Sequence, residues 1–157
     1  MAGVGRLSGS TAIVTGASEG IAEVIAKTLA REGASVALVS RKLAHTQRVS
    51  AEIEASGGTA LALQADVTRA QDVRDMVKAV LDRWGRVDIL VNGVGGFTGH
   101  GPIEDIAEED WDHVITLNMK TAFLCAQAVA TSMMEKRKGR IINIGSVLNV
   151  NAGMLIV

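Results

Sequence analysis

The chain has 157 residues, of which 48% are hydrophobic and 21% are charged, and its formal net charge is −1. These values fit one globular domain with a substantial core and exclude a disordered chain. The near-zero charge gives no electrostatic reason to expect nucleic acid or a membrane surface as a partner. We find no uninterrupted apolar run near the length of a membrane span, and we expect no signal peptide. The single cysteine, Cys125, cannot form an internal disulfide, so we expect a cytoplasmic location.

Short apolar runs alternate with helical patterns along the chain. We expect strands at residues 11–14, 35–39, 60–65, 88–91 and 140–144. Between them, apolar residues recur with the spacing of one helix face, as in Val73, Met76, Val77 and Val80. Thr68 and Gln71 have the spacing of a capping box at the start of that helix. Four repeats of strand, helix and glycine predict an α/β fold with a doubly wound parallel sheet, in one domain over residues 1–157.

Glycines are expected to end the helices. Each expected helix is followed by a glycine just before the next strand, where a left-handed residue is favoured. These glycines are Gly33, Gly57, Gly58, Gly85 and Gly139.

The first expected strand runs into the turn Thr-Gly-Ala-Ser-Glu-Gly-Ile-Ala at residues 15–22. A glycine-rich turn between a strand and a helix places backbone N–H groups and a helix N-terminus where a phosphate can bind. The spacing is not that of the common dinucleotide fingerprint, and the lysine of a mononucleotide loop is absent. Taken alone, the turn is equally well explained as a tight structural connection.

A second glycine-rich loop, residues 92–102, follows the fourth expected strand. Its glycines indicate close approach of the backbone to a ligand, with a variable surface loop as the alternative. In a doubly wound sheet the first and fourth strands flank the point where the strand order reverses and ligands bind. Residues 40–42 and 66–67, at the ends of the second and third strands, then reach the same place.

A long helix is expected over residues 111–136. Its middle, residues 121–130, is apolar on nearly every side, which is typical of a helix buried all round. Two explanations stay open, namely burial in the core and a subunit interface in a homo-oligomer.

These segments together resemble the short-chain dehydrogenases/reductases over the whole chain. Residues 15–22 are similar to the family's Thr-Gly-x-x-x-Gly-Ile-Gly loop, residues 92–95 to its Asn-Asn-Ala-Gly motif, and residues 139–146 to the strand before its catalytic serine. The resemblance implies a Rossmann fold whose C-terminal strands and helices lie beyond the printed residues. It also implies cofactor-binding roles for Gly16, Ser18, Glu19, Gly20, Ile21, Ser40, Arg41, Asp66, Val67, Asn92 and Gly93.

Three departures from the family pattern stand out: Ala22 replaces the third glycine, Gly93-Val94 replaces Asn-Ala, and Glu19 sits where NADP-binding members often carry a cation. Arg41 follows the second strand, with no acidic residue beside it to take a ribose hydroxyl. A guanidinium suits a 2′-phosphate, so we expect NADP(H) rather than NAD(H).

The resemblance also implies a reaction, in which a hydride moves between nicotinamide and a carbonyl or alcohol substrate. Ser146 would bind the substrate oxygen, and Asn118 would hold a water of the proton relay. The family's acid–base tyrosine belongs to a Tyr-x-x-x-Lys motif near position 159, and the sequence contains no tyrosine. We therefore expect these 157 residues alone to be inactive. The alternative is a non-catalytic nucleotide-binding or partner-binding module.

The substrate is less well defined. Residues 144–147 are similar to those of 3-oxoacyl-[acyl-carrier-protein] reductases, which are our first expectation, and other carbonyl reductases remain open. The three histidines have no metal-ligand spacing among themselves or with Cys125, so no metal site is expected.

Overall fold

The computed structural model describes residues 5–97 and 102–145. Within them, one parallel sheet has the strand order β3-β2-β1-β4-β5. Its strands are β1 (Thr11–Thr15), β2 (Ser35–Ser40), β3 (Thr59–Gln64), β4 (Ile89–Asn92) and β5 (Arg140–Asn143). The α-helices are α1 (Gly20–Arg31), α2 (Leu43–Ala55), α3 (Ala70–Trp84), α4 (Glu108–Ile115) and α5 (Thr121–Glu135). The expected doubly wound α/β fold is confirmed, and the strand order reverses between β1 and β4.

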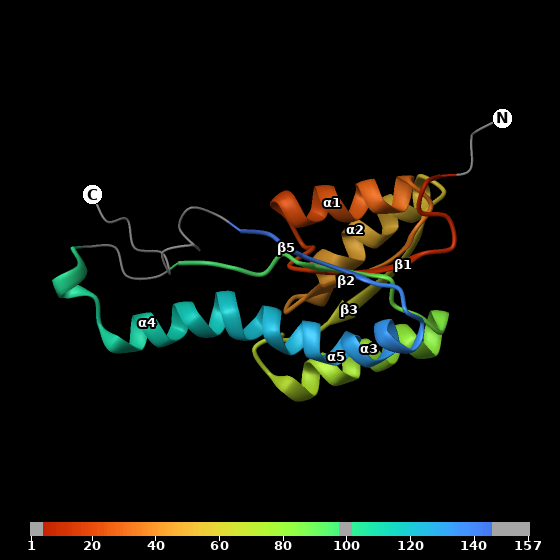
Figure 1. Ribbon diagram of the computed structural model, residues 1–157. Helices are drawn as coiled ribbons and strands as arrows, with labels where there is room; N and C mark the ends of the chain where they lie inside the picture. Colours follow the sequence, from red (N-terminus) through yellow and green to blue (C-terminus); the bar gives the residue numbers. More distant parts are fainter. Residues whose placement is uncertain (1–4, 98–101, 146–157) are drawn as a thin grey trace.

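Helices cover both faces of the sheet (Figure 1). The α1 and α2 helices lie on one face, and α3 and α5 lie on the other. Successive side chains of a strand point to opposite faces, so Ile13 packs toward α3 and α5 while Ala12 and Val14 pack toward α1 and α2. The central strands are buried on both sides, which explains why they read as continuous apolar runs.

Two local predictions were wrong. Helix α3 begins at Ala70 without a side-chain cap, because Thr68 donates its hydroxyl to Asp66 instead of forming a capping box with Gln71. After α5 the residue with positive φ is Arg137, at 48°, whereas Gly33, Gly57 and Gly85 have the expected positive φ. Gly139 leaves room for Met133, since a Cβ at position 139 would lie 2.8 Å from the Met133 Cβ.

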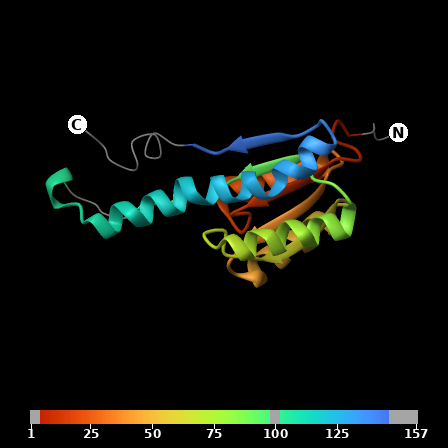
Figure 2. The same ribbon diagram turned by 60° about the horizontal axis from the view of Figure 1, so that its bottom comes forward.

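The long helix begins at Glu108, three residues before the expected start, and continues to Glu135 through a π-helical turn at Thr116–Lys120. Figure 2 shows α4 and α5 as one rod that extends past the sheet. Within the described residues of this single chain, the middle of the helix is buried on one side only, so burial all round by the chain's own core is not observed, and the subunit interface stays a prediction. Cys125 and Val129 are fully buried against the sheet, but Phe123 is 59% exposed on the opposite side.

This rod also has the length and hydropathy of a membrane span, with 22% of its most apolar window buried. Our reading of the sequence did not anticipate that. Core helices of soluble proteins share this length and hydropathy.

Strand β5 forms an exposed edge of the described sheet. Ile141 and Ile142 are neighbours, so their side chains lie on opposite faces, and both are nearly half exposed. The described residues therefore cover both faces of β5 only in part.

Candidate functional site

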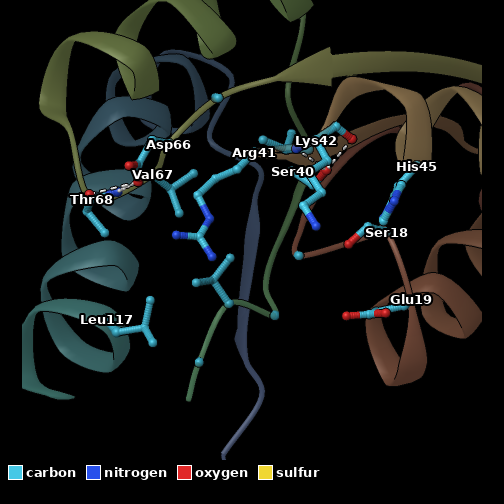
Figure 3. Close-up of a pocket in the computed structure, with 16 residues that line it drawn as sticks. Ser18, Glu19, Ser40, Arg41, Lys42, His45, Asp66, Val67, Thr68 and Leu117 are labelled. Atoms are coloured by element: carbon cyan, nitrogen blue, oxygen red, sulfur yellow. Dashed lines mark hydrogen bonds between the residues drawn. The ribbon is translucent and has the colours of Figure 1, made fainter. Parts of the chain in front are cut away.

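A hollow of about 450 Å³ opens at the carboxyl ends of β1, β2, β3 and β4 (Figure 3). It lies at the point where the strand order reverses, the usual ligand position in an open α/β sheet. Ser18, Glu19 and His45 stand on one side, and Asp66, Val67, Thr68 and Leu117 stand on the other. Ser40, Arg41 and Lys42 lie between the two sides.

The loop after β1 comes very close to the loop after β4. Gly16 has φ of 71°, and a Cβ built on it would lie 2.8 Å from the carbonyl oxygen of Gly93. The backbone N–H of Gly93 in turn donates to the Thr15 hydroxyl at 3.1 Å. The N–H of Ala17 donates to the Val39 carbonyl at 3.2 Å, which ties the same loop to β2. Gly16 is therefore required for both its conformation and its lack of a side chain.

The turn after β2 presents two cations to the hollow. The Ser40 hydroxyl donates to the Lys42 carbonyl at 2.9 Å and accepts from the Lys42 N–H at 3.2 Å. From β3, the Gln64 side-chain amide donates to the Arg41 carbonyl at 3.0 Å. The backbone of the turn is thereby fixed, while the side chains of Arg41 and Lys42 remain exposed at the lining of the hollow.

Asp66 occupies a structured turn after β3. Its carboxylate accepts from the Thr68 hydroxyl at 2.7 Å and from the Thr68 N–H at 3.0 Å. These hydrogen bonds, aided by the charges of Arg41 and Arg69, lower the pKa of Asp66 against the opposing effect of burial. Asp66 is therefore an ionised acceptor at neutral pH.

Asn118 lies in the π-helical turn and holds the glycine-rich loop. Its Oδ1 accepts from the Gly96 N–H at 3.1 Å, and its Nδ2 donates to the carbonyls of Gly96 at 2.7 Å and Val114 at 2.9 Å. A π-turn inside an α-helix frequently marks a functional position. The described contacts give the Asn118 side chain a loop-anchoring role, and its place in a proton relay stays a prediction.

The structure gathers most of the predicted cofactor residues but not all of them. Eight line the hollow: Gly16, Ser18, Glu19, Ser40, Arg41, Asp66, Val67 and Gly93. Gly20 and Ile21 begin α1 outside this lining, and the Ile21 side chain is exposed.

Asn92, a further residue of the predicted cofactor site, lies at the end of β4 beside β5. Asn92 is buried, and its Nδ2 donates to the Asn143 side chain at 2.9 Å. Within the described residues, its Oδ1 is buried without a hydrogen-bond partner. Ser146 lies outside the described residues.

Reading the sequence missed Gln64 and Arg48, which shape this site, and gave Thr15 no role beyond its place in the glycine turn. Gln64 is the last residue of a recognisable strand, but nothing in the sequence shows that it reaches the turn after β2. Arg48 donates to the Ser18 carbonyl from 30 residues away, at 3.1 Å. Such contacts depend on how α1 and α2 pack, and a single sequence carries no signal for them. Among the described residues no cluster of three or more His, Cys, Asp or Glu side chains could hold a metal.

The fold and the hollow together define an open, doubly wound α/β protein with a candidate ligand site where the strand order reverses. The family model for short chain dehydrogenases matches residues 10–156. The chain belongs to the short-chain dehydrogenase family.

Similar proteins include the 3-oxoacyl-[acyl-carrier-protein] reductase of Synechocystis, 41% identical over 150 residues, with 95% of this chain and 59% of the relative covered. The corresponding Staphylococcus epidermidis enzyme is 40% identical over 139 residues, with 88% and 57% covered. The chain thus spans less than two thirds of the length of these relatives.

Solved structures show the same likeness. A metagenomic short-chain oxidoreductase, solved in complex with NADP, superimposes with a TM-score of 0.84 at 38% identity, over 89% of this chain and 63% of that one. A short-chain dehydrogenase/reductase from Burkholderia xenovorans gives a TM-score of 0.87 at 38% identity, over 93% and 60%.

Proposed function

We propose that the whole protein is an NADP(H)-dependent oxidoreductase that interconverts a carbonyl and an alcohol, and that residues 1–157 form its cofactor-binding part. The observation that carries the proposal is the hollow at the reversal of strand order, where the glycine turn meets Arg41 and Lys42. The relative solved with NADP supports the choice of cofactor.

The residues present fit a dinucleotide. The close approach of Gly16 to Gly93 leaves a backbone surface free of side chains, which suits a pyrophosphate group. Arg41 and Lys42 would take the 2′-phosphate of the adenosine ribose, and Asp66 with Val67 would border the adenine. Glu19 also faces this hollow from the α1 side, and its carboxylate opposes the binding of an anion there.

The chemistry of the bound nicotinamide is hydride transfer. The protein must then hold the substrate oxygen and exchange one proton with it. We assign the first task to Ser146, and we expect Asn118 to support the relay by fixing the glycine-rich loop. The family's acid–base tyrosine has no counterpart in these residues, because the sequence contains no tyrosine. We therefore propose that residues 1–157 alone bind cofactor without turnover.

A 3-oxoacyl thioester is the proposed substrate, since the curated relatives named above are 3-oxoacyl-[acyl-carrier-protein] reductases. The experiment is an assay of NADPH oxidation with a 3-oxoacyl thioester and a panel of simple ketones. We expect turnover by the whole protein and none by residues 1–157. Turnover by residues 1–157 would contradict the assignment of the proton step, and NADPH binding without turnover by the whole protein would favour a binding module.

The exposed side of the α4–α5 rod is proposed as a homo-oligomer interface. Met119, Phe123 and Met134 are each more than half exposed on this rod. Exposed apolar side chains gathered on one element commonly mark a protein interface. We favour a second copy of the protein over a lipid bilayer as the partner, because the opposite side of the same helix packs on the sheet. A cytoplasmic location is proposed with it.

A further inference from the structure

Four charged side chains join α1 to α2 behind the glycine turn. Arg48 of α2 donates to the Glu23 carboxylate of α1 at 2.7 Å and to Glu52 of its own helix at 2.7 Å. Lys27 of α1 donates to the same two carboxylates. The Glu23 side chain is only 15% exposed, and Arg48 and Lys27 lower its pKa to about 2.

Arg48 differs from Lys27 in one contact. Its Nη2 also donates to the backbone carbonyl of Ser18 at 3.1 Å, inside the glycine turn. Arginine can serve this carbonyl and two carboxylates together, because its planar fork carries five N–H donors in fixed directions.

The Ser18 carbonyl belongs to the same peptide group as the Glu19 N–H. All described peptide bonds are trans, so these two groups point in opposite directions. When Arg48 draws the carbonyl toward α2, the Glu19 N–H is directed away from α2. Ser18 and Glu19 both line the hollow, so the peptide between them is among those that a ligand there would meet.

We propose that Arg48 is a positioning residue that fixes the Ser18–Glu19 peptide with its N–H available to the cofactor pyrophosphate. The inference rests on the proposed cofactor site. It adds a residue that lies outside the lining of the hollow and acts on it through the backbone.

Lys27 provides a matched control. Arg48→Met and Lys27→Met each remove a cation from the same two carboxylates, but only Arg48→Met removes the contact with Ser18. We expect similar losses of thermal stability in the two variants. Arg48→Lys keeps a positive charge beside Glu23 but lacks the planar guanidinium that also binds the Ser18 carbonyl. It is therefore a milder substitution than Arg48→Met.

The first measurement is amide hydrogen exchange of residues 15–22 in the free protein. We expect faster exchange in Arg48→Met and Arg48→Lys than in the wild type, and no change in Lys27→Met. Equal exchange in the Arg48 and Lys27 variants would overturn the inference. This readout needs no ligand, so it stands even if the chain binds no cofactor.

The second measurement compares NADPH with 2′-AMP, which carries the adenosine 2′-phosphate but no pyrophosphate. We expect Arg48→Met to weaken NADPH binding about tenfold, as for the loss of one charge-assisted donor, and to leave 2′-AMP within twofold. Unchanged NADPH binding, or an equal loss for both ligands, would overturn the role assigned to Arg48. A wild-type chain that binds neither ligand would instead refute the proposed function.

Discussion

Ala22 and Gly93 are complementary in shape. A Cβ built on Gly93 would lie 2.8 Å from the Cβ of Ala22 and 2.6 Å from the carbonyl oxygen of Thr15. Both residues depart from the family pattern that the sequence resembles, one by gaining a methyl group and the other by losing a side chain. The methyl group of Ala22 thus occupies space that a side chain at position 93 would need.

This pairing predicts a coupled effect of mutation. Gly93→Ala should lower the free energy of unfolding by about 1–3 kcal/mol, because it overpacks a closed contact. Adding Ala22→Gly should restore part of that loss and leave the clash with Thr15. The measurement is a double-mutant cycle by urea unfolding. Strictly additive effects of the two substitutions would show that the residues are not coupled.

Asn118 is predicted to hold the glycine-rich loop in place. Asn118→Ala removes the acceptor for the Gly96 N–H and the donor to two carbonyls, and we expect a loss of about 1–3 kcal/mol. Limited proteolysis should then cut the chain faster near residues 93–97. As a control, Gln127→Ala changes an exposed amide on the same rod and should leave the cutting rate unchanged. Equal rates in all three proteins would contradict the anchoring role.

Arg41 is predicted to set the preference for NADP(H). Arg41→Gln should weaken NADPH binding about tenfold or more and change NADH binding little, because only the first ligand carries the 2′-phosphate. Arg31→Gln, an exposed arginine at the end of α1, is the charge-matched control. The test is a fluorescence titration with both cofactors. An equal loss of affinity for NADPH and NADH would show that Arg41 contributes to binding without recognising the 2′-phosphate.

The ion pairs of Glu23 predict a pH-dependent contribution to stability. The pKa of Glu23 is about 2 in the folded chain and 4.5 in its ordinary state, so the ionised form favours folding. The contribution is fully present above pH 4.5 and is lost as the pH falls toward 2. Glu23→Gln should therefore cost about 1 kcal/mol at pH 7, where solvent screens its partly exposed partners, and less at pH 3. A cost that grows on acidification would contradict this sign.

Phe123 tests the proposed interface. Phe123→Glu should lower the solution mass of the protein, because it places a charge at the centre of the exposed apolar side of the rod. Gln47→Glu adds the same charge on α2 and should leave the mass unchanged. The solution mass of each variant is measured by sedimentation velocity. A wild-type monomer would contradict the homo-oligomer, and sedimentation of the protein with phospholipid vesicles would favour the membrane alternative.

The strand pattern and most of the site could be predicted from the sequence, because parallel strands buried on both faces leave continuous apolar runs. The strand ends then placed Arg41, Asp66 and Gly93 around one hollow. For the helix over residues 121–130, the face that packs on the sheet could not be predicted, because small apolar residues on every side conceal it. Phe123 proved exposed.

Contacts between elements were not predictable for a different reason. The Thr68 hydroxyl donates to Asp66 and does not cap a helix. Arg48 of α2 donates to Ser18 in the turn before α1. Both outcomes depend on the relative placement of segments, which residue types and spacing do not specify.

The most direct test of the account is hydrogen exchange of the 157-residue chain with and without saturating NADPH. We predict protection in four segments that are separate in sequence and meet at the hollow, namely residues 16–19, 39–42, 65–68 and 93–95. Another hollow lies between the C-terminal ends of α1 and α2, at Gly33 and Ser56, and this second hollow should show no protection. Absence of protection in those four segments, or protection confined to the second hollow, would contradict the proposed cofactor site.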